Sequence, residues 1–199
     1  MSLECKKNPQ TGESLYFTVH KSGLKIYIMP RKGYSSGYAI FGTKYGSVDS
    51  EFVVPGENTP TKVPDGIAHY LEHKMFDMPD GSNVFDSFSR FGGNANAFTS
   101  FNMTAYLFSA ASNFEDNLRV LMDYVQKPYF TEESVKKEQG IIGQEIKMYD
   151  DSADWRVFFN FLGCLYANNP VKKDVAGTVE SIAKIDKELL YKCYNTFYN

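Results

Sequence analysis

The chain has 199 residues, of which 43% are apolar and 16% aromatic, so it can bury the core of one sizeable domain. Its formal net charge of −3 gives no electrostatic reason to expect binding to nucleic acid or to an anionic membrane. The first residues lack the apolar stretch of a signal peptide, and no run of about 18 apolar residues predicts a membrane span.

The first third of the chain predicts β-strands. Alternating apolar and polar residues indicate strands over 15–20 and 24–29, joined by a turn at 21–23, and a third strand over 37–45. Residues 46–63 are rich in Gly, Pro, Asn and Asp, so we expect a long loop there.

Two helices and two more strands are expected next. Asp65 is a suitable N-cap for a helix that reaches about Met78, and apolar residues at helical spacing predict a second helix over 83–91. A Gly-Gly pair ends that helix, and strands follow over 95–100 and 103–110.

The remainder of the chain has a helical pattern. Thr131 is expected to cap a long helix that reaches Asp150, with further helices over 155–166 and after Asp186. Strands therefore come first, a helix pair interrupts them, and helices close the chain. This order predicts one α+β domain over 1–199, with helices packed on one face of a mostly antiparallel sheet.

Cysteine usage favours a reducing compartment. Cys5, Cys164 and Cys193 are odd in number and far apart in sequence, which argues against a disulfide framework. No CxxC pair is present, so a thiolate zinc site is not expected. We expect a cytoplasmic protein in which Cys164 and Cys193 are ordinary buried thiols. Trp155, near a helix start, is expected to be a packing residue.

The pattern H-x-x-E-H lies within the first predicted helix, at His69, Glu72 and His73. Positions i, i+3 and i+4 share one helix face, so both imidazoles and the carboxylate point the same way. Two histidines one turn apart can bind one zinc ion, and the carboxylate between them can reach a water on that metal. The alternative is a pair of surface histidines beside a helix glutamate.

A catalytic zinc ion usually has three protein ligands, so a third ligand is expected elsewhere in the chain. In the long helix after Thr131, Glu138 and Glu145 fall on the same face as Ile142 and Tyr149. Carboxylates on an otherwise apolar face cost free energy unless something pairs with them, and a metal site would remove that cost. The alternative is that both pair with lysines at the rim of the face.

The order H-x-x-E-H is that of the inverzincins. The segments GIAHYLEH at 66–73 and EQGIIGQEI at 138–146 together resemble the pitrilysin family of zinc peptidases, which includes insulin-degrading enzyme and the mitochondrial processing peptidases. The resemblance implies one Zn²⁺ per chain and a general base at Glu72. It also implies three zinc ligands, His69, His73 and Glu145. Glu138 is implied to support the site as a catalytic residue.

The resemblance implies a zinc-dependent endopeptidase that hydrolyses extended peptides or unfolded protein segments. One alternative is a non-catalytic partner subunit of such a peptidase, although these usually lose ligands. Another is a structural zinc site in a binding protein, which would need four protein ligands. Lys74 stands where many relatives carry an apolar residue, and the chain looks closer to the bacterial processing-protease-like branch.

A third matching segment runs from Gly92 to Ser100 and contains Asn-Ala-Phe-Thr at 96–99. In similar proteins the equivalent strand lies at the sheet edge beside the zinc, and the substrate adds to it as an extra strand. The resemblance thus implies substrate-binding roles for four residues, Asn96, Ala97, Phe98 and Thr99. The alternative is that Asn96 only serves a turn or a bulge.

The family also implies a second, homologous half or subunit. In relatives, two similar halves close over the peptide like a clamshell, and this chain stops about where relatives begin a further strand of the first half. We therefore expect residues 1–199 to be an N-terminal zinc-binding domain that lacks its last strand and the second half. By itself such a chain is expected to fold and bind zinc but to be a poor enzyme.

Overall fold

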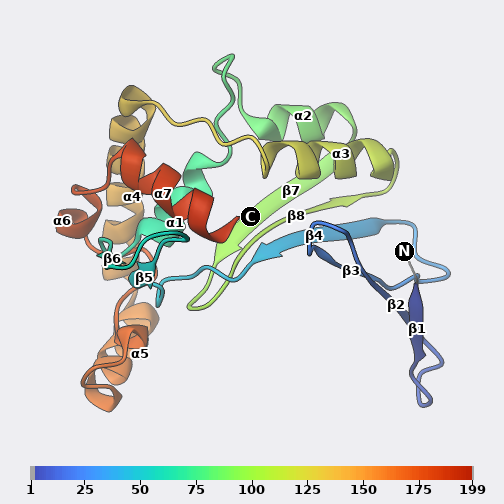
Figure 1. Ribbon diagram of the computed structural model, residues 1–199, viewed down its shortest axis with the longest axis horizontal. Coiled ribbons are helices and arrows are strands. Elements are labelled where there is room, and N and C mark those ends of the chain that lie inside the picture. Colours follow the sequence, from blue (N-terminus) through green and yellow to red (C-terminus); the bar gives the residue numbers. More distant parts are fainter. Residues whose placement is uncertain (1–2, 199) are drawn as a thin grey trace. The chain divides into compact units, whose positions relative to one another are not determined.

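Figure 1 shows a computed structural model of the chain, which describes residues 3–198. The chain divides into two compact units, Met1–Ser36 and Gly37–Asn199. The strands are β1 (Glu4–Lys7), β2 (Ser14–Val19), β3 (Lys25–Ile28), β4 (Gly37–Thr43), β5 (Glu51–Val53), β6 (Pro60–Lys62), β7 (Gly93–Thr99) and β8 (Thr104–Ala110). The helices are α1 (Ile67–Lys74), α2 (Val84–Arg90), α3 (Phe114–Tyr124), α4 (Glu132–Asp150), α5 (Ala153–Leu165), a 3₁₀ turn (Pro170–Lys172), α6 (Val179–Ile182) and α7 (Lys187–Phe197).

The first unit is a three-stranded antiparallel sheet in the order β1-β2-β3. Its cross-strand pair Phe17 and Tyr27 places the two ring centroids 4.9 Å apart, and an ion pair joins Arg31 to Glu13. β1 is missing from the sequence prediction because its residues, Glu-Cys-Lys-Lys, show no apolar alternation.

The second unit contains an antiparallel sheet in the order β4-β8-β7, so β7 is an edge strand, as the sequence predicts. One face of this sheet joins the core through Phe41, Tyr106 and Phe108, whereas Tyr38 and Ile40 on the other face are exposed. Helices α1 and α2 contact β7, and α3 contacts β8 and lies beside α2 (Figure 1). The predicted α+β class with helices on one sheet face is therefore confirmed.

Two sequence predictions for this unit are wrong in detail. Residues 46–63 contain the short antiparallel hairpin β5–β6 rather than only a loop; strands of three residues are too short to show alternation. The thiol of Cys164 is exposed, because it lies on the outer side of α5, whereas Cys193 is buried as predicted. Among the described residues, no helix is long and apolar enough to cross a membrane.

Helix α1 begins one residue later than predicted, with Gly66 as its N-cap. Gly66 has φ of 89°, and a Cβ atom there would lie 2.3 Å from the carbonyl oxygen of Ala176. Only glycine allows this backbone conformation and this close approach. Asp65 instead forms an ion pair of 2.8 Å with Lys173, and its carbonyl oxygen accepts a hydrogen bond from Ser181. The loop before α6 is thereby held against the start of α1.

Helix α4 begins at a capping box formed by Thr131 and Ser134, as the Thr131 cap predicts. It packs against α1, and the buried hydroxyl of Tyr70 in α1 donates a hydrogen bond to the carbonyl oxygen of Val135 in α4. This contact sets the two helices side by side, so residues on their facing sides come together across the sequence.

Candidate metal centre

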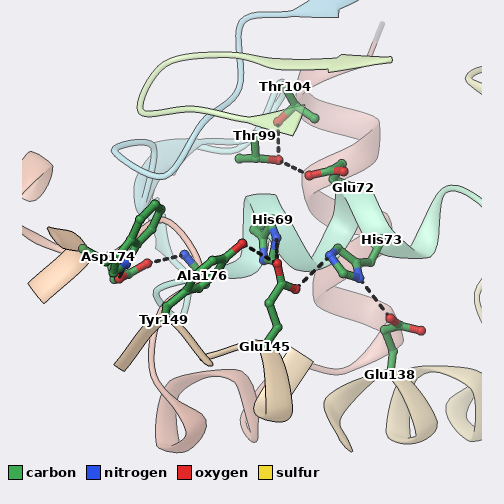
Figure 2. A network of polar contacts seen from close by, with 11 residues as sticks. His69, Glu72, His73, Thr99, Thr104, Glu138, Glu145, Tyr149, Asp174 and Ala176 are labelled. Carbon is green, nitrogen blue, oxygen red and sulfur yellow. Dashed lines mark hydrogen bonds and ion pairs between the residues drawn. The ribbon is translucent and has the colours of Figure 1, made fainter. Parts of the chain in front are cut away.

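The facing sides of α1 and α4 bring two imidazoles and one carboxylate together (Figure 2). The Nε2 atom of His69 lies 3.7 Å from Oε1 of Glu145, and Nε2 of His73 lies 3.4 Å from Oε2 of the same carboxylate. In the described part of the chain, His69, His73 and Glu145 form a group whose possible ligand atoms all lie within 4.8 Å of one another.

Glu138 contacts the ring of His73 on the side opposite Glu145. Its Oε1 is 3.0 Å from Nδ1 of His73, so the carboxylate orients the ring and leaves Nε2 facing Glu145. Because both carboxylates face histidines, the lysine-rim alternative for Glu138 and Glu145 is wrong. His69 is buried, at 8% exposure, so the alternative of two surface histidines is wrong as well.

The donor set suits a zinc ion. Catalytic zinc sites use histidine nitrogens and a carboxylate oxygen, and bonds of about 2.0–2.1 Å in a tetrahedron place ligand atoms about 3.3–3.4 Å apart. The separations of 3.4 and 3.7 Å between the Nε2 atoms and Glu145 are close to that spacing. Among the described residues the group has three members, which leaves a fourth position open.

The charges around the group favour a cation. Burial, together with the neighbouring His73, lowers the pKa of His69 to about 4, so its ring is neutral near pH 7. Burial lowers the pKa of His73 too, but hydrogen bonds to Glu138 and Glu145 outweigh it and raise that pKa to about 10. The hydrogen bond to His73 holds the pKa of Glu145 at about 2. The two carboxylates thus stabilise positive charge at the place where a metal ion would lie.

Glu72 points from α1 toward the end of β7. Its Oε2 accepts a hydrogen bond of 2.9 Å from the hydroxyl of Thr99, which also lies 3.4 Å from the hydroxyl of Thr104 (Figure 2). Burial raises the pKa of Glu72, while His73 and the Thr99 hydrogen bond oppose that shift. The family resemblance implies that Thr99 binds substrate, and the structure shows in addition that its hydroxyl is bonded to Glu72.

A cavity of about 350 Å³ opens beside these groups. Ala97, Phe98 and Thr99 form one part of its wall, and it is also lined by His69, Glu72, His73, Glu145, Tyr149, Trp155, Val175 and Ala176. Asn96 is exposed in a regular part of β7, opposite Leu107, so the alternative of a turn or bulge is wrong. Its side-chain oxygen accepts a hydrogen bond of 2.9 Å from the backbone N–H of Ala97, and Asn96 is not among the residues that line the cavity.

Sequence reasoning missed four residues at this cavity, of which Val175 and Ala176 lie in the loop after α5 and Tyr149 and Trp155 have contacts of their own. The hydroxyl of Tyr149 donates a hydrogen bond of 2.5 Å to Oε1 of Glu145. The i, i+4 spacing of these two residues in one helix is a signal that predicts such a contact. Trp155, expected only to pack, lines the cavity from α5 and stacks on Tyr149. No sequence spacing indicates that second contact, because it depends on how α5 folds back on α4.

Comparison with known proteins identifies the family. The model of the insulinase family (peptidase family M16) matches residues 55–179. The uncharacterized zinc protease YmfH of Bacillus subtilis (strain 168) is 57% identical over 190 residues, covering 96% of this chain and 44% of YmfH. The crystal structure of an M16-like peptidase from Alicyclobacillus acidocaldarius matches with a TM-score of 0.87 at 41% identity, covering 100% of this chain and 44% of that one.

The crystal structure of pitrilysin shares the fold, with a TM-score of 0.78 at 14% identity over 100% of this chain and 22% of pitrilysin. The resemblance read from the two motifs is therefore confirmed. The chain spans 44% of the length of YmfH and of the Alicyclobacillus peptidase. The chain belongs to the insulinase family, peptidase family M16.

Proposed function

We propose that this member of the insulinase family is the zinc-binding, catalytic half of a zinc endopeptidase that cleaves extended peptides or unfolded protein segments. The observation that carries the proposal is the convergence of His69, His73 and Glu145 within 4.8 Å beside a cavity that Glu72 also lines. One zinc ion per chain would be held by these two imidazoles and the Glu145 carboxylate, with Glu138 orienting the ring of His73.

Zinc, when bound, supplies a Lewis acid that polarises the scissile carbonyl and makes water more acidic. Glu72 is the general base: its carboxylate takes a proton from the attacking water and later gives it to the leaving amine nitrogen. The Thr99 hydroxyl donates its hydrogen bond to Oε2 of Glu72, so Oε1 remains available to accept this proton. The Thr99 contact therefore holds the base in one orientation beside the cavity.

The edge strand β7 is proposed to bind the substrate. Within residues 3–198, β7 is hydrogen-bonded to β8 on one side only, so its other side is available to an extended peptide. Ala97, Phe98 and Thr99 line the same cavity as Glu72, which would place an added strand next to the base. Backbone pairing of this kind grips a peptide whatever its side chains, as a protease of unfolded segments requires. We include Asn96 among the substrate-binding residues because it fixes the backbone of Ala97.

A second homologous half or subunit is proposed as partner, because the chain spans 44% of the length of its relatives. Closure of such a half would exclude water from the cavity and strengthen the electrostatic interactions inside it. The chain alone is therefore expected to bind zinc but to cleave slowly. We place the protein in the cytoplasm, where its three free cysteines would remain reduced.

The test combines metal analysis with a cleavage assay. The chain is loaded with zinc, dialysed and analysed for metal, and cleavage of a fluorogenic peptide is followed with and without a chelator. The same assays are run on a chain extended through a second half. We expect one zinc per chain in both, with chelator-sensitive cleavage that is faster in the longer chain.

Three other outcomes are informative. Zinc binding without cleavage in the longer chain would support the alternative of a non-catalytic partner subunit. Absence of zinc binding would contradict the proposed metal centre, and equal turnover per zinc in both chains would show that the second half is dispensable.

A further inference from the structure

Tyr149 contacts the proposed zinc ligand Glu145 within one helix. The two residues are four positions apart in α4, and the Tyr149 hydroxyl donates a hydrogen bond of 2.5 Å to Oε1 (Figure 2). The other oxygen, Oε2, faces Nε2 of His73 at 3.4 Å. The two carboxylate oxygens thus have different partners, and this fixes the orientation of the carboxylate.

Tyr149 is itself held by two residues outside α4. Its ring stacks on Trp155 of α5, with centroids 4.5 Å apart and planes inclined by 14°. The indole N–H of Trp155 donates a hydrogen bond to Asp174, and the other oxygen of Asp174 accepts one of 2.9 Å from the backbone N–H of Ala176. Ala176 is in turn packed against the glycine that starts α1. A continuous set of contacts therefore joins both ligand-bearing helices through this aromatic pair.

A glutamate side chain has several rotatable bonds, and a free carboxylate exchanges between many orientations. A metal ion that binds such a ligand must first restrict it, which lowers the affinity. A hydrogen bond to the oxygen that does not face His73 removes much of this freedom before the metal arrives. Such contacts around metal ligands typically change metal affinity by about 10–100-fold.

We propose that Tyr149 is a positioning residue for Glu145, kept in place by the stacked Trp155 and its hydrogen bond to Asp174. The inference rests on the proposed function, because it takes Glu145 as a zinc ligand. It assigns the hydroxyl of Tyr149 a role in metal affinity, and it assigns the pair Trp155–Asp174 a role in holding Tyr149 rather than in packing alone.

The test compares Tyr149→Phe with the unchanged chain, both stripped of metal. The variant keeps the stacked ring and loses only the hydroxyl. Zinc affinity is measured by competition with a chromophoric chelator, and the absorption spectrum of the cobalt-substituted protein reports on the coordination. We expect zinc affinity to fall about 10-fold, the cobalt spectrum to change, and the melting temperature of the metal-free protein to stay the same.

Tyr166→Phe is the matched control, because Tyr166 lies beyond the end of α5 and is 41% exposed. It should leave zinc affinity and the cobalt spectrum unchanged. If the unchanged chain binds no zinc, the proposed function fails. If it binds zinc and Tyr149→Phe has the same affinity and cobalt spectrum, the positioning role is overturned while the proposed function stands.

A second variant covers the case in which Tyr149→Phe does not fold. Trp155→Phe keeps an aromatic ring against Tyr149 and removes the indole N–H that binds Asp174. Its zinc affinity should fall by less than that of Tyr149→Phe, because the hydroxyl that binds Glu145 is retained. Unchanged affinity in Trp155→Phe would overturn the role assigned to Trp155 and Asp174.

Discussion

Helices α1 and α5 show opposite relations between polarity and burial. In α1, seven of eight residues are buried, and they include His69, Glu72 and Lys74. In α5 the sequence is more apolar, yet Leu162 is the one buried residue of its 13. Val157 and Phe161 on α5 are 69% and 57% exposed. Polarity alone therefore does not decide which of these helices enters the core.

The difference in burial between α1 and α5 indicates where function constrains the sequence. Burying polar groups is unfavourable unless they have partners, and on α1 Glu72 is bonded to Thr99 while Lys74 is paired with Asp77. His69 faces Glu145 at 3.7 Å, and its buried Nδ1 atom has no hydrogen-bond partner among the described residues. The exposed apolar stripe of α5, which includes Val157 and Phe161, is not covered by other side chains within the described residues. If this contrast is right, changes on α1 should alter chemistry or stability strongly, and changes on the outer side of α5 should alter neither.

Glu72→Gln should have the largest effect. Glutamine keeps the shape of the side chain and can still accept the Thr99 hydrogen bond, but it cannot take a proton from water. We expect peptide cleavage by the extended chain to fall by about 10²–10⁴-fold, with zinc content unchanged. Glu133→Gln, on the exposed first turn of α4, is the matched control and should keep full activity. Cleavage at the full rate by Glu72→Gln would show that the assigned base is wrong.

A second comparison uses two thiols, Cys193 in α7, which packs against α1, and Cys164 in α5. Burial raises the pKa of Cys193 from 9.0 to about 11. Below pH 9 both the folded and the unfolded chain keep this proton, so the thiol does not affect stability. Between pH 9 and 11 the unfolded chain loses the proton first, so the free energy of unfolding falls, by up to about 2.7 kcal/mol.

Denaturant unfolding at pH 8, 9, 10 and 11 measures this fall. Other groups titrate in the same range, so the relevant quantity is the difference in pH dependence between the unchanged chain and Cys193→Ala. The variant should lose stability less steeply above pH 9. In the native chain, a thiol reagent should label Cys5 and Cys164 quickly and Cys193 only on unfolding. Parallel pH curves for the two proteins would contradict the raised pKa.

The face that α1 presents at the metal centre could be predicted because its geometry is local. The i, i+3, i+4 positions of His69, Glu72 and His73 share a face in any α-helix. Which glutamate of α4 contacts Nε2 and which contacts Nδ1 of His73 depends on how α4 packs on α1. Residue spacing alone leaves that choice open, and the family resemblance was needed to assign Glu145.

The rest of the cavity depends on contacts between distant segments. Ala176 lies in a loop after α5 and lines the cavity because Gly66 allows its backbone to approach α1. Asp174, in the same loop, accepts a hydrogen bond from the backbone N–H of Ala176. The pairing of β4 with β8 is likewise long-range, so the sequence predicts both strands without predicting a sheet separate from that of β2 and β3. Long-range pairings leave no periodic signal in a single sequence.

Lys74 provides a further test of the buried polar residues of α1 in the comparison with α5. Its side chain is 1% exposed, and its ammonium forms an ion pair with Asp77. Removing one partner of a buried pair leaves an uncompensated charge, whereas replacing the buried charge by an apolar side chain of similar size is often neutral. We expect Asp77→Ala to lower the free energy of unfolding by about 2 kcal/mol, less than for a fully buried pair because Asp77 is partly exposed.

Lys74→Met should change the free energy of unfolding by less than about 1 kcal/mol, since methionine retains the length of the side chain and needs no partner. Both variants are measured by urea unfolding at pH 7. A larger loss for Lys74→Met than for Asp77→Ala would show that the ion pair itself, rather than the unpaired ammonium, dominates the energetics of this position.

The smallest effect is expected on the outer side of α5, and it tests the other half of the comparison. Val157→Ser and Phe161→Ser remove apolar surface that is already in contact with water, so each should change the free energy of unfolding by no more than about 0.5 kcal/mol. Leu162→Ala, at the buried position of the same helix, should cost about 2–5 kcal/mol because it leaves a cavity.

The two surface variants should also lower binding of a dye that senses exposed apolar surface, because they interrupt a contiguous stripe. In the chain extended through a second half, one of two results is expected. If that half covers α5, dye binding is low before any substitution and the serine variants become destabilising; if it docks elsewhere, the variants stay neutral in both chains. A large loss of stability in the short chain itself would mean that the stripe is already packed, and the contrast between α1 and α5 would then be mistaken.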